Sequence, residues 1–208
     1  MEPQEAADKI RESAEEQEEE KERQGANRFR QEAAIIIGVL AMMLAITSVG
    51  GANTGKEMVN SNIQASDTYA FYQAKNIRQT NTQLASDQLE ALMVTQPNLS
   101  PEAKATIQKR LDAYKATIER YESDPKTGEG KKELLAKAQH FDELRNHAQE
   151  QDPNFDFAEA LFQISIVLGS VSIVATARWL LGISLVLGGI ATVLMLNGFL
   201  LFMHLPIG

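Results

Sequence analysis

The sequence predicts an all-α membrane protein with three transmembrane helices. A long, coiled-coil-like antiparallel helical hairpin is expected between the first and the second of them. Segments 33–52, 155–177 and 179–203 are apolar and nearly free of charge, and about 20 such residues cross the hydrocarbon core of a bilayer. Segment 53–154 is polar, and its first part, 56–94, contains neither glycine nor proline. Such a stretch predicts one uninterrupted helix.

Composition excludes several classes of function. The chain of 208 residues has no cysteine, so disulfides, thiolate zinc sites and cysteine nucleophiles are excluded. Its net charge is −8, which argues against a nucleic-acid partner because phosphate contacts need clustered lysine and arginine.

The first 32 residues predict an acidic tail that is disordered or loosely helical. They hold eleven acidic and six basic residues and almost no large apolar side chain, so they cannot bury enough surface to fold alone. Opposite charges four residues apart allow a transient helix. The tail is either simply solvated or an electrostatic docking arm.

Segment 33–52 is the first predicted span, and its twenty uncharged residues give about 30 Å of helix. Arg28 and Arg30 precede it, and Gly50 and Gly51 are expected to loosen or kink its exit.

The predicted outgoing arm of the hairpin, 56–94, carries an apolar residue at every seventh position, although the intervening partner positions are mostly polar. We predict that this narrow seam faces the returning arm. Its residues are Ile63, Ala70, Ile77, Leu84 and Ala91.

The returning arm is predicted over 101–150. Ser100 and Pro101 have the pattern of a helix cap followed by a first-turn proline. A 4-3-4-3 seam then runs through Ile107, Leu111, Tyr114, Ile118 and Tyr121. Segment 123–130, with a proline and two glycines, is expected to bulge from this arm.

Chain length decides how the arms are arranged. The outgoing arm spans about 58 Å, and the two helical pieces of the returning arm together span about 63 Å at 1.5 Å per residue. Both pieces must therefore run back along the first arm for the chain to reach the second span. A three-helix up-down-up bundle would leave residue 150 far from the bilayer.

A new helix is predicted to start at Asp152-Pro153 and to lead into the second span. Arg178 and Trp179 connect it to the third, and a short tail, 204–208, follows. Five basic residues near the membrane on the amino-terminal side, against three on the other, favour a cytoplasmic amino terminus with the hairpin outside.

The run Ile63–Gln79 resembles the signature of a bacterial membrane family catalogued as domain of unknown function 4337. Members usually read Gln-Ala-Ser-Asp-Gln-Trp-(Ala/Ser)-Tyr-Tyr-Gln-Ala-Lys, and here Thr68, Tyr69 and Phe71 depart from that pattern. Segments 162–168 and 196–200 are also similar to the family, and the resemblance covers roughly residues 30–201. It implies a bacterial inner-membrane protein and no activity. Together with the charge asymmetry, this makes a periplasmic hairpin the expected topology.

The same run supplies the candidate interaction surface. Its aromatic, amide and charged side chains fall on two neighbouring helix faces. They pack either against the returning arm or a second copy of the chain, or they meet a ligand or partner. These residues are Asp67, Tyr69, Phe71, Tyr72, Gln73, Lys75, Asn76 and Arg78.

Polar residues within the predicted spans form a second candidate group. Glu159 and Gln163 lie one turn apart at the start of the second span, and Asn197 lies in the third. Intramembrane carboxylates suggest function, whereas an amide more often bonds a neighbouring helix. Small residues recur one turn apart at Ser165 and Gly169 and at Ser184, Gly188 and Thr192, which predicts close helix packing.

No catalytic, cofactor-binding or metal site is predicted. His140, Glu143 and His147 share a helix face, but the two histidines are about 10 Å apart along the helix and cannot share one ion. No phosphate loop, zinc-protease helix or nucleophile elbow occurs in the sequence, so an enzyme is not expected.

Three functions remain. The first is a structural or interaction protein that acts through the hairpin, with the lipid bilayer and a homo-oligomer or another membrane protein as partners. The second is a small transport or channel subunit lined by the intramembrane polar residues. The third is a membrane sensor, which rests on analogy of architecture alone.

Overall fold

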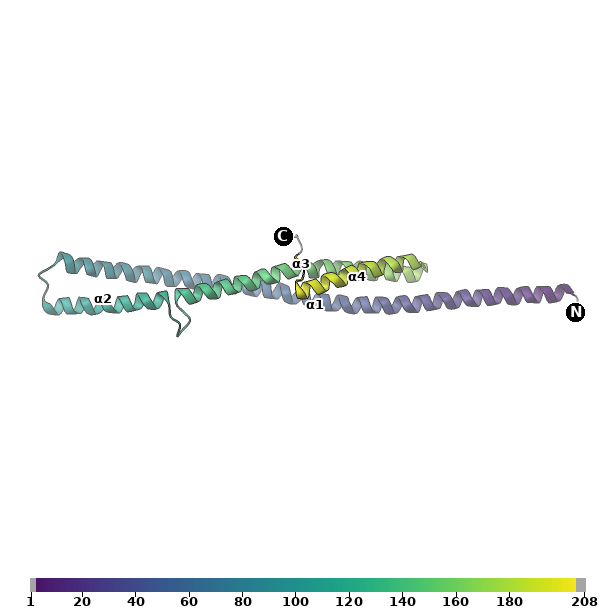
Figure 1. Cartoon of the computed structure of the whole chain (residues 1–208), viewed down its shortest axis with the longest axis horizontal. Coiled ribbons are helices and arrows are strands. Elements are labelled where there is room, and N and C mark those ends of the chain that lie inside the picture. Colours follow the sequence, from purple (N-terminus) through teal and green to yellow (C-terminus); the bar gives the residue numbers. More distant parts are fainter. Residues whose placement is uncertain (1–2, 205–208) are drawn as a thin grey trace. The chain divides into compact units, whose positions relative to one another are not determined.

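The computed structural model describes the backbone of residues 3–204 and the side chains of residues 16–204. This part of the chain is all-α and contains no strand (Figure 1). Its helices are α1 (Pro3–Thr95), α2 (Pro101–Glu122), α3 (Lys131–Ala175) and α4 (Arg178–Leu200). By length and composition, α1, α3 and α4 each contain a segment able to cross a membrane.

The chain divides into two compact units. Among the described residues, the first comprises 3–55 and 149–204, and the second comprises 56–148. Helices α1 and α3 contribute to both units, whereas α4 belongs to the first and α2 to the second.

Helix α1 begins at Pro3 and includes the acidic segment, which is therefore helical in the described part. Arg23 pairs with Glu19 four residues earlier at 3.6 Å, as the charge spacing predicts. The expected loosening at Gly50 and Gly51 is wrong, because α1 continues through both glycines to Thr95.

Helix α3 likewise continues through Pro153, so the predicted helix start at Asp152-Pro153 is wrong. A proline inside a helix removes one backbone donor and crowds the preceding turn. The side chain of the next residue, Asn154, donates to the carbonyl of Glu150 at 3.0 Å. The carbonyl that loses its donor to the proline is the one before it, that of Gln149.

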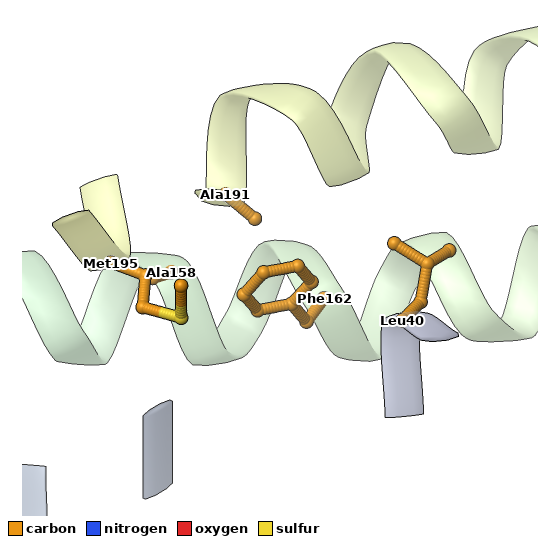
Figure 2. Packing of buried hydrophobic residues seen from close by; sticks show 5 residues of the cluster. All are labelled: Leu40, Ala158, Phe162, Ala191 and Met195. Atoms are coloured by element: carbon orange, nitrogen blue, oxygen red, sulfur yellow. The ribbon is translucent and has the colours of Figure 1, made fainter. Parts of the chain in front are cut away.

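The first unit has an apolar core between three helices. Figure 2 shows Leu40 of α1, Ala158 and Phe162 of α3, and Ala191 and Met195 of α4 converging at this point. Phe162 and both alanines are fully buried. A second small cluster joins Phe29, Ala33 and Leu181.

The small-residue stripes of α3 and α4 meet in the first unit, as predicted. The Ser165 hydroxyl donates to the Ser184 carbonyl at 3.0 Å, and the Ser184 hydroxyl donates to the Ser165 carbonyl at 2.7 Å. A Cβ added at Gly188 would lie 2.5 Å from Leu40 Cδ2, and one at Gly169 would lie 2.9 Å from Ile37 Cγ1. The glycines therefore let α1 approach both helices closely.

Phe155 occupies a second close contact in this unit. A Cβ added at Gly50 of α1 would lie 2.7 Å from Phe155 Cε1, and one at Gly198 of α4 would lie 2.9 Å from the same atom. The ring also packs edge-on against Phe199, with centroids 4.9 Å apart at 77°. Gly50 thus provides room for an aromatic side chain instead of bending the helix.

The first unit is apolar outside and partly polar inside. Large aliphatic side chains are exposed on all three helices, among them Ile35, Met42, Val49, Val167, Val174, Val186 and Leu200. Hydroxyl and amide side chains are fully buried, among them Thr47, Ser165, Ser172, Ser184 and Asn197. No buried side-chain nitrogen or oxygen in residues 16–204 lacks a hydrogen-bond partner.

In the second unit, the predicted seam of the outgoing arm lies on the wrong face. Ile63, Ile77 and Leu84 are 52%, 61% and 55% exposed, and Ala70 and Ala91 are exposed too. The buried positions are instead small and mostly polar: Ser61, Ala65, Thr68 and Ser86. They also follow heptad spacing, which apolar periodicity alone could not reveal because small side chains let helices pack closely without being strongly hydrophobic.

Residues of the predicted 107–121 seam and of the first part of α3 are buried or half-buried in the second unit. Leu111, Leu134 and Ala138 are buried, and the other residues of the 107–121 seam are half-buried. Ser100 caps α2 by accepting a hydrogen bond from the Ala103 amide at 3.2 Å. The segment between α2 and α3 bulges away from the helices (Figure 1).

One carboxylate fastens both ends of that bulge. Glu133 accepts from the Ser123 hydroxyl at 2.6 Å and from the Asp124 amide at 3.0 Å. Gly130 sits so close to Ser123 and Asp124 that any side chain there would overlap their backbone. The hydrogen bond from Ser123 holds the pKa of Glu133 below its usual range.

This lowered pKa predicts an acid-sensitive connection. A carboxyl with a depressed folded-state pKa stabilises the fold above its unfolded pKa, and that contribution is lost as the pH falls through the folded value. We expect the thermal midpoint of the second unit to decrease once the pH is lowered past about 4.3, which is the ordinary pKa of glutamate. Circular dichroism melts of the natural chain and Glu133→Gln across pH 3–7 would measure the difference. The variant should be less stable at pH 7 and less sensitive to acid. An identical pH profile for both would contradict the assignment.

Candidate functional site

The predicted interaction surface divides into an inward and an outward set. Asp67, Gln73 and Arg78 are exposed, and Phe71 is 38% exposed. The remaining four predicted residues are half-buried or bonded to α3 or the bulge. They are Tyr69, Tyr72, Lys75 and Asn76.

Tyr69 belongs to a polar network between α1 and α3. Its hydroxyl donates to Asp142 Oδ2 at 2.8 Å, and the other oxygen of Asp142 pairs with Arg145 Nη1 at 3.0 Å. The same Arg145 nitrogen reaches Asn62 Oδ1 at 3.4 Å. The hydrogen bond to Asp142 raises the pKa of Tyr69 above its ordinary value, so the phenol remains a neutral donor.

An open cavity of about 460 Å³ lies over this network. Its lining residues include Ser66, Tyr69, Gln73, Asp142 and Arg145. The Asp142 carboxylate and the Arg145 guanidinium pair with each other. The other polar groups that line the cavity are amides and hydroxyls.

Lys75 is the most enclosed charge of the predicted set. Its side chain is 13% exposed, and its ammonium lies 3.2 Å from Glu129 Oε2. The ammonium also lies 5.2 Å from the ring centre of Phe71 and 5.6 Å from that of Tyr121. Lys75 therefore joins α1 to α2 and to the bulge, through cation–π contacts and one ion pair.

Two amides continue this row of contacts along α1. Asn76 accepts from Lys131 at 3.3 Å, and Gln79 donates to the Ile118 carbonyl and to Glu122, both at 3.1 Å. Lys131 also pairs with Glu122 at 3.0 Å. The amides and the lysine of the signature thus fix the register of α1 against α2 and α3.

Sequence reasoning missed the partners of this surface. Asp142, Arg145, Glu122 and Lys131 look like ordinary solvated charges on their own helices. The one available signal is the three-residue spacing of Asp142 and Arg145, which places them on one face but does not identify Tyr69 as their partner.

The structure separates the three intramembrane candidates. Asn197 is fully buried, whereas Glu159 is half-buried and Gln163 is exposed. Gln163 donates to Glu159 at 3.3 Å on the surface of α3. These two residues form one local pair, and Asn197 is not part of it.

The side-chain amide of Asn197 makes three hydrogen bonds. Its Nδ2 donates to Asn154 Oδ1 at 2.6 Å and to the Met203 carbonyl at 2.8 Å, and its Oδ1 accepts from the Met203 amide at 2.8 Å. The Met203 backbone is held beside α4, and Leu201 takes a left-handed conformation with φ 45°. Helix α4 therefore ends at Leu200, three residues before the predicted end of the third span.

His140 and Glu143 approach each other at 4.0 Å on an exposed face of α3. Within residues 16–204, no group of three histidine, aspartate or glutamate side chains is arranged to hold a metal ion.

The sequence model of a protein family described as "Domain of unknown function (DUF4337)" matches residues 29–201. Comparisons with curated proteins and with solved structures gave no match.

Proposed function

This chain belongs to the DUF4337 family, and from its two units we propose that it is an integral membrane protein with a structural or interaction role. The first unit would anchor the chain in a bilayer. The second would present an antiparallel helical hairpin to a partner, as a scaffold or accessory protein.

The surface of the first unit is the observation that carries the proposal. Water favours apolar interiors, yet here aliphatic side chains face outward on all three helices while hydroxyls and amides are buried. Exposed apolar area on this scale would aggregate in water. In a bilayer, the same pattern matches lipid on the outside and small, hydrogen-bonded residues between the helices.

The order of contacts in the second unit supports the hairpin. Glu90 pairs with Lys115, Gln79 bonds Glu122, and Asn62 bonds Arg145. Partner numbers rise as the numbers along α1 fall, which is the order of two segments running in opposite directions.

The transport alternative has less support. A conducting path needs polar groups that line one route. The Asn197 amide is instead hydrogen-bonded to Asn154 and Met203. Glu159 and Gln163 remain as a pair on an otherwise apolar face, where a carboxylate near a span end can reach the interface. A sensor role is supported by no observation beyond the architecture.

The absence of cysteine makes the topology directly testable. We expect the chain to stay in the membrane pellet after alkaline extraction. In intact cells expressing it, a membrane-impermeant maleimide should label Gln96→Cys but label Gln17→Cys only after permeabilisation. This result would place the hairpin outside and the amino terminus in the cytoplasm.

The natural chain, which has no thiol, is the control for background labelling. Release of the chain by alkaline extraction would refute the membrane anchor. Labelling of Gln17→Cys and protection of Gln96→Cys in intact cells would reverse the orientation.

A further inference from the structure

The second unit leaves a periodic apolar face without a partner. We name the residues Ile63, Ala70, Ile77, Leu84 and Ala91 the heptad stripe. All five are exposed in the described structure, and the three large ones are at least half exposed. The face of α1 that packs inside the chain lies opposite, at Ser61, Ala65, Thr68 and Ser86.

We propose that the heptad stripe is the surface on which a second copy of this chain docks, as a parallel coiled coil of two α1 helices. The inference rests on the proposed function, because two copies inserted in one membrane with the same orientation must present parallel arms.

The shape of the stripe favours a helix as its partner. Side chains seven residues apart stay in line only when two helices supercoil around each other. A helix that lies on lipid instead shows a broad apolar face of at least about 100°. Here the positions between the stripe residues are polar: Ser66, Gln73, Thr80 and Asp87.

The residues that flank the stripe are compatible with a copy of the same chain, because Asp67 is the one charged residue among them and no like charges would meet. In a parallel pair, residues flanking the seam face residues five positions later in the partner. These pairs are Asn62 with Asp67, Tyr69 with Ala74, Asn76 with Asn81, and Gln83 with Gln88. None brings like charges together, and the amides of Gln83 and Gln88 can bond each other. Asn62, Tyr69 and Asn76 are bonded to α3 of their own chain and add no bond across this seam.

The polar residues between the stripe positions lower the stability of the coiled coil and define its register. Buried polar residues in a coiled-coil seam cost stability but disfavour shifted alignments. Asp87 is the one charged residue among them, and Gln83 of the same helix donates to it at 2.9 Å. Confinement of both chains to one membrane raises their effective concentration and offsets the weak seam.

Site-directed crosslinking in native membranes tests the proposal. Ala70→Cys lies on the stripe, and Ala116→Cys lies on an exposed face of α2 as the matched control. With a short homobifunctional maleimide, we expect Ala70→Cys to give an adduct of twice the chain mass, at least five times more abundant than with Ala116→Cys. Adding Ile77→Asp and Leu84→Asp to Ala70→Cys should reduce that adduct at least tenfold.

Equal yields at both positions, or an adduct whose mass shows a different protein, would overturn the proposal. Helical content by circular dichroism should be unchanged in the aspartate variants, because Ile77 and Leu84 contact solvent. Alkaline extraction of the same membranes tests separately whether the chain is inserted in the bilayer. A chain that remains in the membrane without a stripe-specific adduct would refute the dimer surface alone.

Discussion

Replacing Phe155 by alanine is expected to destabilise the first unit by about 3 kcal/mol, at the lower end of the range for buried aromatic residues. The ring is 2% exposed and lies against Gly50, Gly198 and Phe199. The two glycines have no side chains that could move into the space, so the cavity would persist. In lipid the transfer gain is small, but the lost dispersion contacts remain.

Unfolding of the purified chain by SDS in mixed micelles measures this loss, with the fluorescence of Trp179, the single tryptophan, as one readout. Phe157→Ala is the matched control, because Phe157 lies two residues away on the same helix and is 46% exposed. We expect it to change stability by less than about 1 kcal/mol. Equal effects of the two variants would show that the packing of the Phe155 ring between Gly50 and Gly198 contributes little to stability.

Asn197→Leu is expected to have the second largest effect, a loss of about 2–4 kcal/mol. The change removes three side-chain hydrogen bonds and leaves the Asn154 carbonyl oxygen and both backbone groups of Met203 without partners. A buried polar group left unpaired costs about 1–3 kcal/mol, and this applies in full to the Asn154 oxygen. Met203 is exposed, so water can replace part of its lost bonds. The segment after α4 should also come free, because Asn197 is what holds it.

Stability in mixed micelles and protease sensitivity after Leu200 would measure both consequences. Asn53→Leu makes the same chemical change at an exposed position of the first unit and should alter neither. A stable Asn197→Leu chain that had lost transport of a solute would instead revive the transport alternative.

The predicted surface around Tyr69 shows where sequence reasoning stops. The run mixes aromatic, amide and charged residues, which predicts that it contacts another surface. Three of them bind α3 or the bulge through Asp142, Glu129 and Lys131. Those partners lie more than 50 positions away along the chain, and single-sequence periodicity carries no information about pairs at that separation.

The two glycines at 50 and 51 show a similar limit. Glycine favours flexible or tightly packed backbone, and sequence alone cannot choose between these properties. The choice depends on whether a neighbouring helix places a large side chain against the glycine, as α3 does with Phe155.

The sequence by itself determined the helical class, the three apolar segments, the Ser100 cap, the small-residue contact between α3 and α4, and the family resemblance. These properties follow from composition and local spacing, which act within a few turns of helix. Only the tertiary structure decided which face of α1 is buried. Apolar periodicity favoured the Ile63–Leu84 face, but α2 and α3 pack against small and hydroxyl side chains of α1, which allow a closer approach. That packing leaves the heptad stripe exposed.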